Sequence, residues 1–414
     1  MKNTATAKAP TVHFDQLVSR GCGLDVHEKN VVATVDGEGL MKTTRTFDTY
    51  TSSLNELREW LLEHGVTHVA MESTGVYWKP VFNILDDAFK VILVNARHLK
   101  NVPGRKTDRN DSEWICRLLL AGLLRASFVP EENIRQLRDL NRYSTKLTRQ
   151  LAAEKNRIQK VLEDANIKLS SVVSSTSGVV ATGIIDGLMA GRTDLEALIE
   201  EHYHGRLKVS KAELLKAITG RMTDHHRFML EQIKHHMAYL ESRIAVIRQE
   251  VDRLLEDEQQ SIGLLISIPG VKTVTAVKML AEIGTKPGET FGNPKRLAKW
   301  AGICPGNNES GGKKLSGRTT HGNKYLKSLL VEAAWAATRT KGTYLRAKYD
   351  SMAARKGRKK ALLIIGHKIL KAAYIVLTAR LSYMAYSVEE FEKRRNQKRI
   401  VHLQNELKGL GIEV

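Results

Sequence analysis

Short apolar runs alternate with amphipathic stretches over the first third of the chain. Runs at 21–26, 31–35 and 43–47 predict strands, with the turn-forming DGEG at 36–39 between the last two. Runs at 67–73 and 89–95 predict buried strands, and three- and four-residue spacing predicts helices over 51–65, about 76–87 and about 108–124. Strands followed by strand–helix alternation indicate an α/β domain over about 20–128.

The middle of the chain has a different periodicity. Apolar positions recur every three and four residues from Leu137 to Val161, and again from His226 to Leu254. Such spacing over four heptads is typical of a coiled coil, so we expect an arm over 129–258 that holds two or more chains together. A helical insert is expected at about 179–220. Heptad positions explain the paired histidines at 225/226 and 235/236 better than a metal site does.

Two helical stretches flank an apolar–Pro–Gly–apolar turn in LLISIPGVKTVTAVKMLAEIG, residues 264–284. This is the pattern of a helix-hairpin-helix, whose tight turn exposes backbone N–H groups at a helix N-terminus and suits a phosphate oxygen. An ordinary glycine-containing helix connection has a similar sequence. Lys272 lies just after the turn and is a candidate phosphate ligand.

The stretch PGNNESGGKKLSG at 305–317 is rich in Gly and Asn, so we expect a loop rather than a helix or strand, delivered by helices on both sides. It lies in a basic region. Residues 294–327 hold eight Lys or Arg and one acid, and residues 341–371 hold ten against one. This density is typical of contacts with a nucleic-acid backbone.

Overall charge points the same way. The chain carries 65 Lys and Arg against 45 Asp and Glu, a formal net charge of +20, which favours a polyanionic partner. We expect no membrane association, because no apolar run is long enough to span and no signal core follows the N-terminus. The expected location is the cytoplasm, with association to the nucleoid. The three widely spaced cysteines indicate neither disulfides nor a cysteine zinc site.

Four carboxylates follow strands or begin a helix of the first domain: Asp25, Glu72, Asp108 and Asp111. Clustered acids do not all stay ionised without a counter-charge. Two Mg²⁺ ions about 4 Å apart supply that charge and assist in-line attack on a phosphodiester. A solvated first helical turn is the alternative for the pair at 108 and 111, because acids there favour the helix dipole. The adjacent cations Lys106 and Arg109 fit phosphate contacts.

Four segments, GLDVHEK (23–29), MESTGVYW (71–78), KTDRND (106–111) and PGNNESGGKKLSG (305–317), resemble the DEDD-type transposases of insertion sequences. These are bridge-RNA-guided serine recombinases. The resemblance covers roughly residues 20–385. It implies an α/β plus α fold: a RuvC-like, ribonuclease-H-like domain at 20–128, a coiled-coil arm at 129–258 and a mostly helical transposase domain at 259–386. Residues 1–19 and 387–414 are expected to be N- and C-terminal tails.

The resemblance also implies site residues and partners. The four carboxylates become a metal-binding tetrad, and the family's catalytic serine matches Ser310. Donor and target DNA, a guide RNA and a dimeric or tetrameric assembly are implied as partners. The residues that we expect to contact nucleic acid are Lys106, Arg109, Lys272, Lys295, Arg296, Lys313, Lys314, Arg318 and Lys324.

The chemistry around Ser310 fits this role independently. Flanking glycines leave the hydroxyl sterically open, and nearby cations can stabilise charge that develops on phosphorus. No histidine base is adjacent, since His321 is eleven residues away, and metal ions are the better candidate activator. Ser316 and Cys304 are rival nucleophiles.

Two other functions stay open at this point. A metal-dependent junction resolvase or nuclease would use the tetrad alone and leave Ser310 as a loop residue. A non-enzymatic helix-hairpin-helix DNA-binding protein would use neither. Replacing Ser310 by Ala separates the first two functions, and replacing Asp25 by Ala separates both enzymes from the binding protein.

Overall fold

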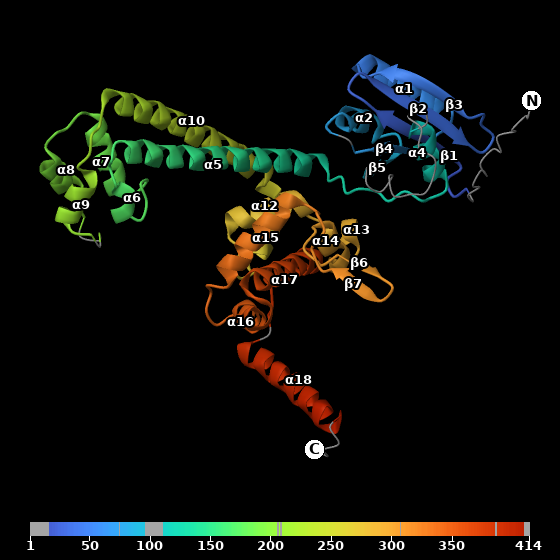
Figure 1. Cartoon of the computed structure of the whole chain (residues 1–414). Coiled ribbons are helices and arrows are strands. Elements are labelled where there is room, and N and C mark those ends of the chain that lie inside the picture. Colours follow the sequence, from blue (N-terminus) through green and yellow to red (C-terminus); the bar gives the residue numbers. More distant parts are fainter. Residues whose placement is uncertain are drawn as a thin grey trace, which may run out of the picture. The chain divides into compact units, whose positions relative to one another are not determined.

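The computed structural model describes residues 16–73, 75–95, 111–204, 207, 209–306, 308–385 and 387–409. The chain divides into two compact units, Met1–Val129 and Pro130–Val414 (Figure 1). The first unit is a mixed α/β domain, and the second is mostly helical.

A five-stranded sheet forms the centre of the first unit. Its strands are β1 (Arg20–Val26), β2 (Asn30–Gly37), β3 (Thr43–Asp48), β4 (His68–Glu72) and β5 (Lys90–Val94). They lie in the order β3-β2-β1-β4-β5. The first three pair antiparallel as a meander, whereas β1–β4 and β4–β5 are parallel. This mixed sheet is consistent with the expected ribonuclease-H-like fold.

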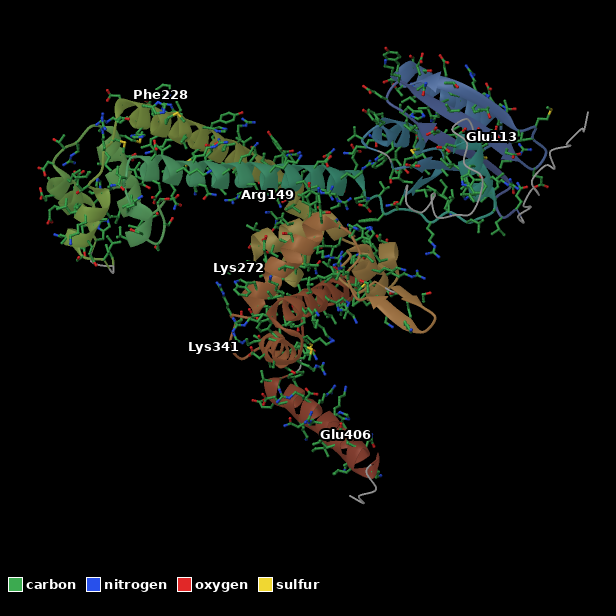
Figure 2. All side chains as sticks on the ribbon, viewed as in Figure 1. Glu113, Arg149, Phe228, Lys272, Lys341 and Glu406 are labelled. Atoms are coloured by element: carbon green, nitrogen blue, oxygen red, sulfur yellow. The ribbon has the colours of Figure 1, made fainter. Side chains whose placement is uncertain are left out.

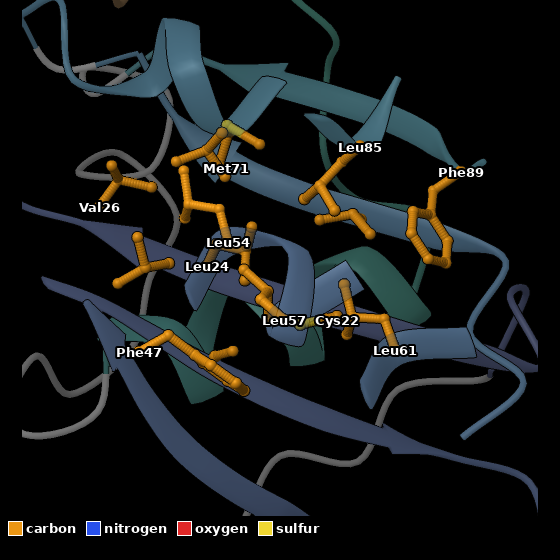
Figure 3. Packing of buried hydrophobic residues seen from close by; sticks show 14 of the residues in the cluster. Cys22, Leu24, Val26, Phe47, Leu54, Leu57, Leu61, Met71, Leu85 and Phe89 are labelled. Atoms are coloured by element: carbon orange, nitrogen blue, oxygen red, sulfur yellow. The ribbon is translucent and has the colours of Figure 1, made fainter. Parts of the chain in front are cut away.

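Helices cover both faces of this sheet. Helices α1 (Thr51–Glu63) and α2 (Trp78–Leu85) pack on one face, where alternate residues of β1 enter the core with leucines of α1 (Figure 3). Helix α4 (Asp111–Leu120) packs on the other face. It approaches β1 so closely that a Cβ on Gly23 would lie 2.2 Å from the Ser112 carbonyl oxygen. A glycine at position 23 is therefore required for this packing.

Two long helices, α5 (Glu132–Asp164) and α10 (Asp224–Leu254), run side by side and begin the second unit (Figure 1). Their joined ends carry a bundle of short helices with its own apolar core: α6 (Leu169–Val172), α7 (Val179–Met189), α8 (Leu195–His202) and α9 (Lys211–Ile218). The predicted arm thus exists as a helical hairpin within one chain.

The heptad residues of α10 are buried inside this hairpin. Leu240 is 2 % exposed and Ile247 is 7 % exposed within a single chain. The seam that we expected to join chains is therefore already filled by α5 and α10 of the same chain. Two contacts between a histidine and a carboxylate also cross between the helices, His226 Nε2 to Asp164 Oδ2 at 2.9 Å and His236 Nδ1 to Glu154 Oε1 at 3.0 Å.

Leu240→Asp should unfold the arm within each chain, because it removes a buried side chain and places an unpaired carboxylate in an apolar seam. We expect a loss of about 3–5 kcal/mol in the stability of the arm, measured by hydrogen exchange along α5 and α10. Val246→Asp is the control, since Val246 is 48 % exposed on the same helix. A Leu240→Asp chain with unchanged exchange but altered sedimentation would mean that the seam joins chains instead.

The remainder of the second unit is a helical domain. It comprises a 3-10 turn η1 (Glu256–Glu258), α11 (Gln259–Ile266), α12 (Thr273–Ile283), α13 (Pro287–Phe291), α14 (Pro294–Trp300), β6 (Asn308–Ser310), β7 (Lys313–Ser316), α15 (Lys324–Ala337), α16 (Tyr344–Lys356), α17 (Arg358–Ala379) and α18 (Val388–Gly409). Helix α17 is central, with contacts to α11, α13, α14, α15 and α16.

Helix α17 also corrects the expectation that no segment is apolar enough to span a membrane. Within the described residues it alone passes that test by length and composition, with a mean hydropathy of 1.6 over its best 18-residue window. Half of that window is buried inside the protein. A core helix passes the same test, and its packing against five neighbouring helices gives α17 that role.

Candidate functional site

Ser310 lies at the end of a strand, not in an irregular loop. Strands β6 and β7 pair antiparallel, with Ser310 opposite Lys313 and only Gly311 and Gly312 between them. Both glycines have positive φ, +56° and +74°, as a two-residue hairpin turn of type I′ requires. The expectation that 305–317 forms neither helix nor strand was therefore wrong, because the Gly-Gly turn allows the flanking residues to pair.

The serine is open to solvent at this turn. Ser310 and Lys313 are exposed, and a Cβ built on Gly311 or Gly312 would have nothing within 4 Å. Within the residues that the structure describes, no side chain hydrogen-bonds to the Ser310 hydroxyl, so none is in place there as a base. The hairpin thus presents a hydroxyl that a phosphodiester can approach.

The base of the hairpin is tightly closed. Gly306 N donates to Arg318 O at 2.8 Å, and Pro305 bridges Thr319. Below this, Gly302 and Gly322 lie in direct backbone contact, since a Cβ on Gly322 would lie 2.3 Å from Gly302 N. Motion of the hairpin is therefore constrained at its base, whereas none of the described residues lies within 4 Å of a Cβ built on either glycine at its tip.

The rival nucleophiles are less favourably placed. The Ser316 hydroxyl accepts a hydrogen bond from Arg318 N at 3.2 Å, so it supports the hairpin. Cys304 is half-buried next to the closed base. The other two thiols are those of Cys22 and Cys116. Burial raises the pKa of Cys22 well above its usual value and the pKa of Cys116 to about 12. Both are therefore protonated and unreactive at neutral pH.

Several predicted nucleic-acid ligands are exposed on the same unit. Lys295 and Arg296 begin α14, Arg318 follows β7, and Lys324 begins α15. Lys272 (Figure 2) precedes α12 and follows a turn in which Gly270 has φ +89° and packs on the backbone of α15. In the register of the β6–β7 hairpin, Lys314 lies opposite Glu309. Lys106 and Arg109 lie outside the described residues.

Two of the predicted metal ligands lie next to each other in the first unit. The parallel pairing of β1 and β4 ends at Leu24 with Met71, so Asp25 and Glu72 occupy the next step of the ladder. Leu24 and Met71 point into the core beneath α1 and α2. Because side chains alternate along a strand, Asp25 and Glu72 both point to the α4 face.

Asp111 begins the helix that covers this face. The neighbouring Ser112 Oγ lies 2.8 Å from Thr34 Oγ1 on β2, which fixes the start of α4 over the sheet. Asp25 itself is 23 % exposed and its Oδ2 lies 3.0 Å from His27 Nε2. Asp108, the fourth predicted ligand, lies outside the described residues.

Asp25 and Glu72 would supply some, but not all, of the ligands that a cation needs. Two carboxylates at one step of neighbouring strands repel each other, and Mg²⁺ takes carboxylate oxygens as ligands. Within the described part of the chain, however, no group of three His, Cys, Asp or Glu side chains is close enough to hold a metal ion. Asp25 and Glu72 are thus the pair that the structure brings together, and a complete set needs further ligands.

Sequence reasoning missed one cluster in the second unit. Glu282 is buried in α12 and binds two arginines of α5. Its partners lie about 140 positions away, so no local motif reveals them. A single acid on the apolar face of TVTAVKMLAEI was the available signal.

Comparison with known proteins finds family matches in both units. Residues 22–167 match a family model described as a transposase, of the DEDD type from IS110 elements, and residues 263–350 match the model for the transposase IS116/IS110/IS902 family. The y4qE protein of Sinorhizobium fredii, whose name describes it as a candidate transposase, is 25% identical over 231 residues. That alignment covers 56% of this chain and about half, 47%, of that protein. The chain therefore carries the two transposase domains of the IS110 insertion-sequence family.

Proposed function

We propose that this protein cuts and rejoins DNA strands during transposition through a covalent phosphoserine link at Ser310. The observation that carries the proposal is the exposed hydroxyl at a Gly-Gly hairpin turn inside the matched transposase domain. A hydrolytic enzyme has no need for such a serine, whereas strand exchange needs a way to conserve the energy of each broken phosphodiester.

In the proposed reaction, Ser310 Oγ attacks a DNA phosphorus. The new Oγ–P bond forms as the bond from phosphorus to the leaving strand's oxygen breaks; the proton of the serine hydroxyl passes to solvent, and the leaving oxygen takes up a proton from solvent. Attack by an oxygen of a second strand reverses the step and releases the serine. Lys313 and Arg318 are exposed near the hairpin turn and would bind the phosphate as charge develops.

The first unit would contribute Mg²⁺ binding. We propose Asp25, Glu72, Asp108 and Asp111 as its ligands, and the adjacent position of the first two supports this assignment. When bound, Mg²⁺ neutralises charge on the phosphate and on the attacking oxygen. The family resemblance further supports a guide RNA that selects the DNA, a dimeric or tetrameric assembly, and a cytoplasmic, nucleoid-associated location.

Trapping the intermediate tests this function. A nicked substrate, whose short leaving strand diffuses away, should leave a protein–DNA adduct that resists detergent, and peptide mapping should find it on Ser310. An adduct on Ser316, Cys304 or a tyrosine would overturn the assignment. Cleavage to free ends with no adduct would instead identify a metal-dependent nuclease.

Binding of nucleic acid should weaken steeply with salt, because cations on the protein release counterions from phosphates. Lys313→Ala and Arg318→Ala should each reduce the slope of log K against log salt by about 1. Lys211→Ala is the matched control, since its charge is already paired with Glu200 at 2.6 Å. Filter binding or fluorescence anisotropy over a salt series gives the slopes, and equal slopes for all three variants would place the hairpin cations away from the nucleic acid.

A further inference from the structure

A buried carboxylate joins three separate parts of the second unit. Glu282 lies in α12 and is only 4 % exposed. A buried charge is costly unless it is paired and hydrogen-bonded. Glu282 therefore requires close hydrogen-bonding partners. These partners come from α5 and from the residue that precedes α15.

The partners on α5 are two arginines. Arg142 donates Nε to Oε1 and Nη2 to Oε2 of Glu282, both at 2.8 Å, a two-pronged pairing of high directional specificity. Arg138 donates to the backbone oxygens of Ala281 and Glu282 at 3.0 and 2.9 Å. Burial lowers the pKa of Arg138 to about 10, which leaves it charged at neutral pH.

The third partner is Asn323. Its Nδ2 donates to Glu282 Oε2 at 2.6 Å, while its Oδ1 accepts from Tyr325 N and Leu326 N and caps α15. Asn323 directly follows Gly322, which closes the base of the serine hairpin. One amide group therefore starts α15 and ties the end of the hairpin to Glu282.

The polar contacts of this cluster lie beside an open space. Arg142, Glu282 and Tyr325 line a cavity of about 230 Å³ whose other walls include Arg149 and Lys278. The Arg142 guanidinium also stacks on the Tyr325 ring at 4.5 Å. Because the cavity leaves space beside these side chains, loss of a hydrogen bond would let them move apart.

We propose that Glu282 is a positioning residue that holds the first turns of α5 and the base of the Ser310 hairpin in one fixed relation. Arg138 and Arg142 anchor the helix that leads in from the first unit, and Asn323 anchors the hairpin. We call the cluster of Glu282, Arg138, Arg142 and Asn323 the clamp. Its role in catalysis rests on the proposed function of Ser310. The clamp itself is testable without it.

Substitutions at Asn323 separate the clamp from the helix cap. Asn323→Asp keeps a good capping oxygen for α15, but removes the donor and places a second carboxylate against Glu282. Glu282→Gln is the second variant, because its side-chain amide nitrogen cannot accept and so cannot take the hydrogen bonds of Arg142 and Asn323 as the carboxylate does. Asn293→Asp is the matched control, because Asn293 caps α14 through Lys295 N and Arg296 N in the same way.

The first readout is a distance within one chain. Spin labels at Lys146→Cys on α5 and Glu309→Cys on β6, in a Cys304→Ser background diluted with unlabelled protein, report how α5 and the hairpin are held. We expect a narrow distance distribution in the parent and in Asn293→Asp, and a broad one in Asn323→Asp and in Glu282→Gln. An unchanged distribution in either Asn323→Asp or Glu282→Gln overturns the clamp.

The second readout is adduct formation on the nicked substrate. Asn323→Asp and Glu282→Gln should each slow it by about 10- to 100-fold, the scale that a misplaced reacting group costs, with DNA affinity unchanged. If the parent forms no adduct at Ser310, the proposed function fails while the distance measurement still decides the clamp. If the parent forms the adduct and Asn323→Asp forms it equally fast, the positioning role fails alone.

Discussion

Ser310→Ala should abolish both adduct formation and recombination, with a rate loss on the order of 10⁴-fold or more, as expected for a removed nucleophile. The variant should fold and bind nucleic acid like the parent, because the serine is exposed and none of the described side chains hydrogen-bonds to its hydroxyl. Single-turnover assays with nicked DNA, together with affinity measurements, test both halves of this expectation.

Ser316→Ala is the matched control for Ser310→Ala. It lies on the same hairpin, and its hydroxyl accepts a hydrogen bond from Arg318 N at 3.2 Å, so we expect a modest effect on rate. Full recombination by Ser310→Ala would remove the serine mechanism and leave the carboxylates of the first unit as the sole catalyst.

The second large effect is expected at the paired carboxylates of the first unit. Asp25→Asn and Glu72→Gln keep side-chain shape but remove the charges that would bind Mg²⁺. Each should reduce strand cleavage by more than the roughly 10–100-fold that loss of an outer partner of a metal ligand costs. Relief of the repulsion between two like charges on adjacent strands should favour the folded state, although Asp25→Asn also weakens the contact with His27.

Glu113→Gln provides the control, on the helix α4 that covers the face of the sheet to which Asp25 and Glu72 point. Glu113 lies in the first turn of α4 (Figure 2) and is paired with Lys42 at 2.7 Å, so its loss should leave cleavage nearly unchanged. Isothermal titration with Mg²⁺ should show weaker binding to Asp25→Asn than to Glu113→Gln. Cleavage that persists in EDTA, or equal activity of all three variants, would contradict the metal assignment.

The two sets of variants also separate the three functions that the sequence left open. A junction resolvase would lose activity with Asp25→Asn and keep it with Ser310→Ala. A purely DNA-binding protein would bind alike in every variant and cleave in none, including the parent. The proposed recombinase needs both groups, so either substitution alone should stop strand exchange.

Local patterns in the sequence were sufficient for much of the fold. Alternating and buried apolar runs identified the five strands, because each strand has one or two faces in a core. Periodic apolar positions identified both long helices of the arm, because a helix buries the same stripe whatever covers it. The position of Asp25 and Glu72 at strand ends was also visible in the sequence, as was the open site at Ser310.

Contacts between distant segments decided the rest. The stripe on α10 does not specify its partner, and only the turn-back through α6–α9 places α5 of the same chain against it. Pairing across Gly311 and Gly312 turns a polar, glycine-rich segment into a hairpin, since backbone hydrogen bonds between strands outweigh composition. Glu282 meets Arg142 across 140 positions, and such a pair forms only once the helices are packed. The sequence by itself thus determined which residues are buried or chemically suited to a site, and the tertiary structure decided which of them meet, because burial is a property of each segment whereas a contact depends on two.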